Sequence, residues 1–178
     1  SSGWSTTGNT GTDTSVNFIG TKDYMPLRFK FNNQNAGLLS QENTAFGFQA
    51  FNSVNNSSLL NTAFGHSALI MFQNGFGNVG LGSAGLGQLK GGNTNIGIGF
   101  GSMALHHGDN NILISNTNGA GVIDTFLVGN VIIGNQRTTT GLSLGSDKNV
   151  LIGNYAGGSY INGGSNVAVG DSASGGNT

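Results

Sequence analysis

The chain has 178 residues, of which 33 are Gly and one is Pro, and it contains no Cys. Six basic residues face seven acidic ones, so no basic stripe could neutralise a nucleic-acid backbone, and disulfides and thiolate metal sites are excluded. Only 7% of residues are charged but 36% are hydrophobic, which is enough to build a core and argues against a disordered polar chain. No apolar run approaches the roughly 18 residues needed to cross a bilayer, so we expect no membrane insertion by this segment.

Residues 1–40 are predicted to form a leader that contains β-strands. The stretch "LRFKF", from Leu27 to Phe31, alternates apolar residues with Arg28 and Lys30, which is typical of a half-exposed strand. A repeat array follows in residues 41–178. Because the first coil of a repeat array needs cover, we expect the leader to be an N-terminal β cap.

The array is built on the motif N-x-x-apolar-Gly, which occurs as NTAFG, NTAFG, NVGLG, NIGIG, NILIS, NVIIG, NVLIG and NVAVG. Seven of the eight copies close on glycine, and the exception is Ser115. The closing glycines are Gly47, Gly65, Gly82, Gly99, Gly134, Gly153 and Gly170. A period of about 17 residues is too short for paired helices and fits one coil of a β-solenoid. The predicted fold class is therefore all-β, a parallel β-roll or β-helix solenoid.

The second and fourth motif positions point to one side of a strand, and the third points to the other. The third position is never polar: it holds Ala45, Ala63, Gly80, Gly97, Leu113, Ile132, Leu151 and Ala168. The second and fourth positions are also apolar, apart from Thr44 and Thr62. The strands are therefore predicted to be buried on both faces, one filling the coil and the other packing outside it. Identical chains around a common axis would cover that second face, which predicts a homotrimeric fibre once the resemblance below is considered.

Two further columns of residues recur. Asparagine opens every copy, and we interpret it as a turn residue whose amide can stack in a hydrogen-bonded ladder. These residues are Asn43, Asn61, Asn78, Asn95, Asn111, Asn130, Asn149 and Asn166. A small residue follows the glycine by three positions and predicts a tight corner: Ala50, Ala68, Gly85, Ala156 and Ala173, with Ala104 reached after a two-residue insertion.

The "NTAFGxxAL" and "NVAVGxxA" units resemble the head repeats of trimeric autotransporter adhesins. They also resemble "TAIGYQAL" arrays in phage tail fibres and in bacterial surface proteins that carry an endosialidase-type chaperone domain. The leader, with "NFIGT" and "PLRF", looks like the segment that precedes such arrays. The resemblance implies a homotrimeric, extracellular fibre on a bacterial cell or a phage-like tail, with a cell-surface glycan or protein as receptor and no cofactor. Residues 115–148 depart from the pattern, because the period lengthens to 19 there, and inserted loops are expected.

Exposed aromatic and imidazole side chains are the candidate binding residues, since such rings can stack on sugars. The candidates are Phe100, His107, Tyr155 and Tyr160, together with Phe48 and His66, which follow a motif glycine as Phe100 does. The alternative is that the phenylalanines pack between coils or chains, because Phe is usually buried. The irregular region 115–148 is the other predicted binding surface.

Two motifs suggest other chemistry but lack its context. "GLGSAG", from Gly80 to Gly85, satisfies the dinucleotide-binding pattern, yet no helix is expected after it. His106 and His107 could bind a metal, but neighbouring residues on a strand point to opposite sides, so at most one would face inward. We predict that the chain is not an enzyme, because it shows no singled-out carboxylate pair, nucleophile elbow or phosphate-binding loop.

The sequence is compatible with three functions. The first is a trimeric fibre segment of an adhesin or tail-fibre-like protein that mediates attachment to a cell surface. The second is a purely structural stalk or spacer. The third, an ice-binding solenoid, ranks last because it needs a flat row of Thr, whereas Val79 and Ile96 replace Thr44 and Thr62 in that column.

Overall fold

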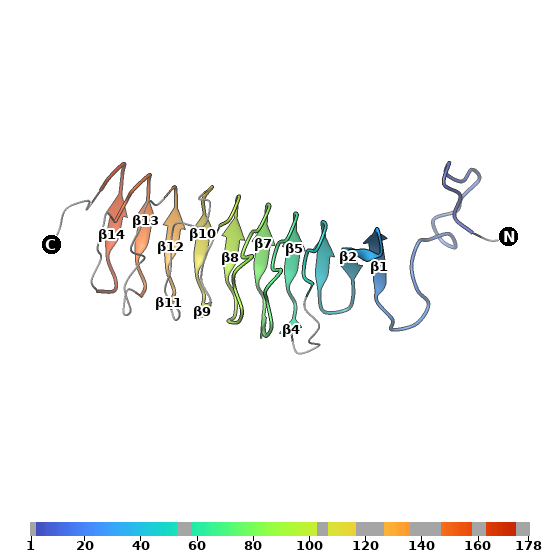
Figure 1. The fold of residues 1–178 in the computed structure, drawn as a ribbon, viewed down its shortest axis with the longest axis horizontal. Helices are drawn as coiled ribbons and strands as arrows, with labels where there is room; N and C mark the ends of the chain where they lie inside the picture. The colour runs from blue at the N-terminus through green and yellow to red at the C-terminus, as the bar shows by residue number, and fades with distance from the viewer. Residues whose placement is uncertain are drawn as a thin grey trace.

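The fold was derived from a computed structural model, which describes residues 3–52, 58–102, 107–116, 127–135, 147–157 and 163–173. Short strands stack one above another along a single long axis (Figure 1). These residues contain strands, turns and bends but no helix. The predicted all-β parallel solenoid with coils of about 17 residues is confirmed.

The main sheet contains ten strands in the order β1-β2-β3-β5-β7-β8-β10-β12-β13-β14. From β3 onward every pairing is parallel, and each motif position pairs with the same position in the next coil, as in Thr44↔Thr62 and Phe46↔Phe64. These eight core strands are β3 (Thr44–Phe46), β5 (Thr62–Phe64), β7 (Val79–Leu81), β8 (Ile96–Ile98), β10 (Ile112–Ile114), β12 (Val131–Ile133), β13 (Val150–Ile152) and β14 (Val167–Val169). The 19-residue steps do not shift this register, because β10, β12 and β13 still pair position by position.

The leader contributes the first two strands of the same sheet. Strand β1 (Leu27–Phe31) and strand β2 (Gln34–Leu39) form an antiparallel hairpin, and Asn32 and Asn33 both adopt positive φ in its tight turn. Strand β2 pairs antiparallel with β3, which covers the backbone edge of the first repeat. Residues 3–26 form no strand and are exposed to solvent.

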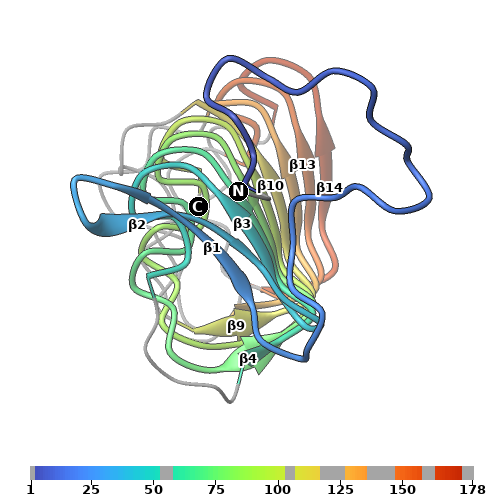
Figure 2. The same cartoon turned by 90° about the vertical axis from the view of Figure 1, so that its right-hand side faces the viewer.

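A second side of the coil carries shorter pairings. Strand β4 (Ser58–Leu59) pairs with β6 (Gly75–Phe76), and β9 (Gly108–Asp109) pairs with β11 (Leu127–Val128), all in parallel. Two single bridges, Asn74↔Gly91 and Gly91↔His107, continue this ladder. Viewed along the axis, the main sheet forms one side of the coil, and β4 and β9 lie on another (Figure 2).

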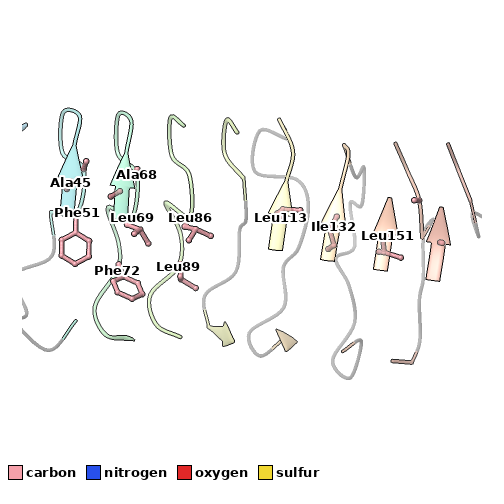
Figure 3. Packing of buried hydrophobic residues seen from close by; sticks show 14 residues of the cluster. Ala45, Phe51, Ala68, Leu69, Phe72, Leu86, Leu89, Leu113, Ile132 and Leu151 are labelled. Carbon is pink, nitrogen blue, oxygen red and sulfur yellow. The ribbon is translucent and has the colours of Figure 1, made fainter. Parts of the chain in front are cut away.

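The coil interior is filled by the third motif position together with side chains from the opposite corner (Figure 3). In the middle coils, where the strand supplies only Gly80 and Gly97, Leu69 and Leu86 occupy the space. A Cβ added at Gly80 would lie 3.3 Å from the Cγ atom of Leu69 and 2.6 Å from a backbone oxygen, and one at Gly97 would lie 2.5 Å from Leu86. Further along, the buried strand residues Leu113, Ile132 and Leu151 fill the coil instead. Volume is therefore conserved along the core although the residue that supplies it changes.

The third motif position faces inward and is buried in the described core strands. The second and fourth positions point outward and stay partly exposed in a single chain, with Phe64 58% and Ile133 36% accessible, so the packing of this second face against other chains stays a prediction. The structure corrects one expectation. The small residue at the corner of the fourth coil is Ser102 and not Ala104. The backbone N–H of Leu86 donates to the carbonyl of Ser102, just as that of Leu69 donates to the carbonyl of Gly85, so Ser102 and Gly85 occupy equivalent places. Ala104 itself lies outside the described residues.

Candidate functional site

The motif asparagines form a continuous ladder of hydrogen bonds along the solenoid. In each step the Oδ1 atom of one asparagine accepts both the backbone N–H and the side-chain Nδ2–H of the next, at 2.9 to 3.2 Å. Six of the eight side chains are buried, and those of Asn78, Asn95 and Asn149 are inaccessible to solvent. A buried amide is tolerated only when its groups are paired, and stacked copies of the same residue satisfy one another.

The same amides also close the corner that leads into each core strand. The Nδ2 group of Asn78 donates to the carbonyl of Phe76, two residues earlier, and to that of Gly92 in the next coil. The residue just before each asparagine except Asn43 has positive φ, whatever its type. This column contains Leu60, Gly77, Thr94, Asn110, Gly129, Lys148 and Ser165. These residues share no side-chain chemistry, so nothing in the sequence marks them as one column.

The motif glycines are required by both backbone conformation and close packing. Each has a φ between 106° and 133°, and a Cβ on any of them except Gly170 would approach a carbonyl oxygen of the following coil more closely than 3.0 Å. The column comprises Gly47, Gly65, Gly82, Gly99, Gly134, Gly153 and Gly170. The eighth copy, Ser115, is not among the residues with positive φ. The glycines therefore let successive coils approach closely at the end of each strand.

The second and fourth motif positions are the first and last residues of each core strand. Together they form a surface that we call the outward face. It carries no charged residue, and its polar members are Thr44 and Thr62, both near the leader. Phe29, Phe46 and Phe64 form a row of rings at this end, with centroids 5.6 and 5.9 Å apart, and aliphatic side chains continue the row to Val169. Val169 itself is 63% exposed. A contiguous apolar surface of this kind is typical of an interaction site.

A neighbouring column starts directly after the motif glycine and changes character along the chain. Near the leader it carries Phe31, Phe48 and His66, which we call the aromatic strip. The centroid of Phe48 lies 6.1 Å from that of Phe31 and 5.7 Å from that of His66. Toward the other end the column becomes a second amide ladder, in which Asn116 and Asn135 accept the backbone N–H of the preceding coil.

The predicted binding residues are not brought together. Phe100 lies in the column of the aromatic strip and is 49% exposed, and Tyr155 lies at the same corner three coils later with a positive φ and 40% exposure. His107 is half-buried in the bridge to Gly91, on another side of the coil. Tyr160 lies outside the described residues, as do residues 117–126 and 136–146 of the predicted irregular binding region.

The motifs that suggested other chemistry have structural places in the repeats. The glycines of "GLGSAG" lie on strand β7 and the corner after it, where Gly85 is buried. His106 lies outside the described residues, and the described part of the chain brings no three His, Cys, Asp or Glu side chains together as a metal site would require. In the leader, hydrogen bonds from the hydroxyl and then the backbone N–H of Ser15 lower the pKa of Asp13 below its usual value.

Comparisons with protein-family models, with curated proteins and with solved structures find no match for this chain. Among the described residues there is no helix of the length and apolarity that a membrane span requires.

Proposed function

We propose that this chain is a section of a homotrimeric extracellular fibre, of the adhesin or tail-fibre kind, that attaches a bacterium or a phage-like particle to a cell surface. The observation that carries the proposal is the outward face, which is apolar, uncharged and continuous over all eight core strands. Its exposure is costly in water, at roughly 25 cal/mol for each Å² of apolar surface, so a partner that covers it is strongly favoured.

Three parallel copies in register around a common axis are the partners that best fit this face. Each residue of the outward face then lies at the same height along the axis as the same residue of the other two chains. The rings of Phe46 and Phe64 would meet the same rings of the other chains, and Ile133 would meet its two copies. A match of this kind needs no second surface, because rotational symmetry brings the same patch of each chain together. The hairpin of β1 and β2 would then cap the first repeat by covering the edge of β3.

The mass in dilute solution tests the trimer. Sedimentation equilibrium is expected to give 3 × 18.1 kDa, about 54 kDa. A mass of 18.1 kDa over the full concentration range would contradict the shared-axis arrangement.

Attachment is tested separately, with the fluorescently labelled chain and a panel of bacterial and animal cells. Saturable binding to some cell types, displaced by unlabelled chain, is the expected result. A stalk without recognition is the second candidate function, and the strict register across the 19-residue steps favours it, since a spacer needs only regular stacking. Absence of saturable binding across the panel, with a mass near 54 kDa, would favour the stalk.

A further inference from the structure

We infer that the aromatic strip and the amides beside it form a binding site for a neutral, pyranose-containing glycan, and this inference rests on the attachment function proposed above. The strip lies at the leader end of the array, one column beyond the outward face. It unites residues from the hairpin and from the first two repeats that are far apart in the sequence.

The outer two rings, Phe31 and His66, are exposed, the ring of Phe48 between them is half-buried, and all three are held in place. Phe31 is 68% exposed at the end of β1, and Phe48 meets it edge-on, at an interplanar angle of 80°. His66 is tilted by 32° relative to Phe48, and its Nδ1 atom is paired with the hydroxyl of Ser67 at 3.0 Å. The backbone carbonyls of Phe48 and His66 both accept hydrogen bonds from the next coil. A ligand would therefore meet rings whose spacing is fixed before it binds.

Two pairs of side-chain amides connect the hairpin to the same corner. The Nε2 atom of Gln49 donates to the Oε1 atom of Gln34 at 3.1 Å, and the Nδ2 atom of Asn35 donates to the Oδ1 atom of Asn52 at 2.9 Å. Gln34 is the cross-strand partner of Phe31, and Gln49 follows Phe48 directly, so the first pair adjoins the rings.

An amide pair that shares one hydrogen bond keeps three N–H donors and three carbonyl lone pairs for a ligand, whichever way the two amides are turned. For the pair of Gln34 and Gln49, no described residue takes up that remaining capacity. Sugar hydroxyls act as donor and acceptor at once, so a pair of adjacent hydroxyls matches this arrangement.

The charge of the site selects a neutral ligand. Apart from the imidazole of His66, the strip and the amide pairs contain no ionisable side chain, and the nearby Lys30 ammonium already donates to Asn33 at 3.2 Å. A phosphate, sulfate or carboxylate ligand would require cationic partners, and a bound metal would require anionic ones. A pyranose ring instead offers an apolar C–H face for the rings and hydroxyls at its rim for the amides.

The test uses the complete chain on an array of neutral, sialylated and sulfated oligosaccharides. We expect binding to at least one neutral glycan, weakened tenfold or more by Phe31→Ala or His66→Ala and more modestly by Gln34→Ala. Phe100→Ala is the matched control, because Phe100 occupies the same column and is also exposed, but no ring contact involves it among the described residues. This variant should bind as the unsubstituted chain does.

Several outcomes would overturn the inference. These are the absence of any neutral glycan among the ligands, binding that survives Phe31→Ala combined with His66→Ala, or loss of binding in Phe100→Ala to the same degree. Sedimentation of each variant adds a further check: if Phe31→Ala changes the mass, the ring is a contact between chains and not a glycan site. A chain that still binds cells but no neutral glycan would refute this site and leave the attachment function standing.

Discussion

Asn78 shows how one residue type can support a whole array. Its Oδ1 atom accepts two hydrogen bonds from Asn95, and its own backbone and side-chain N–H groups donate to Asn61. An alanine at this position would leave buried donors and acceptors unpaired in both neighbouring coils, where each costs about 1–3 kcal/mol.

We therefore expect Asn78→Ala to lower the free energy of unfolding by about 3 kcal/mol or more. Asn166→Ala is the matched control, because Asn166 makes the same two donations to Asn149 but is exposed, and its Oδ1 atom accepts nothing from a described residue. Urea denaturation followed by circular dichroism measures both. Equal losses in the two variants would show that burial of the ladder contributes nothing.

The motif glycines allow the cost of backbone conformation to be separated from that of packing. Gly65 and Gly170 have nearly the same φ, 130° and 127°, but a Cβ at Gly65 would strike the carbonyl of Gly82, whereas one at Gly170 would meet only the Cβ of Ala173 at 3.8 Å. Both alanine variants should lose about 1–3 kcal/mol from the positive φ. Gly65→Ala should lose about 1–3 kcal/mol more from the forced separation of coils. Denaturation midpoints that coincide for the two variants would contradict the packing contribution.

At the scale of the strand, the effect of an introduced charge on the assembly of chains should depend on whether its position lies on the outward face. Ile133 is partly exposed on this face, on the sixth of the eight core strands, so Ile133→Lys should leave the coil of a single chain folded. Around a shared axis, however, it would bury three like charges, each costing several kcal/mol. We expect this variant to sediment near 18.1 kDa while its β-sheet circular dichroism remains.

Leu60→Lys is the control for that experiment. Leu60 is exposed and has the positive φ of its corner column, where Lys148 already occupies the equivalent place in another coil. This variant should keep the mass of the unsubstituted chain. A trimer mass for Ile133→Lys would exclude the outward face as the contact between chains.

The elements also show which parts of the fold a single sequence can predict. Strand positions and their parallel order follow from periodicity, because a strand alternates and a stacked repeat pairs with itself. Which face points inward did not follow, because both faces are apolar in the sequence. Ser102 at the corner was missed because the prediction followed the identity of Ala104, whereas the corner depends on backbone pairing and admits any small residue. The sequence also did not predict that the side chains of Leu69 and Leu86 fill the space left by the missing side chains of Gly80 and Gly97. Residues with complementary volumes come to face each other only after folding.

The candidate site was less predictable than the fold. Phe48 and His66 were recognisable as candidates because they follow a motif glycine, and of the two His66 is exposed whereas Phe48 is half-buried. Their partner Phe31 was not, because the antiparallel docking of the hairpin onto β3 has no counterpart in the repeats. The pair of Gln34 and Gln49 depends on the same docking. Contacts between unlike segments cannot be obtained from a repeat period.

In the whole molecule, each coil contacts its neighbours in the stack, and the backbone hydrogen bonds of the main sheet run from one coil to the next along the long axis (Figure 1). Stability in such an array is close to a sum over adjacent coils, without a central core on which all of them depend. Damage at one coil is therefore expected to remain local, provided that both neighbouring ladders can still pair.

The direction of those bonds also determines how the rod would respond to a pulling force on its two ends. Tension along the axis breaks the backbone hydrogen bonds between adjacent coils one coil at a time and does not shear all of them together. Each coil that detaches replaces about 4.8 Å of rod with about 58 Å of extended chain, roughly a twelvefold lengthening. A section built this way is compliant under load, because it releases extended polypeptide one coil at a time while the remaining coils stay folded.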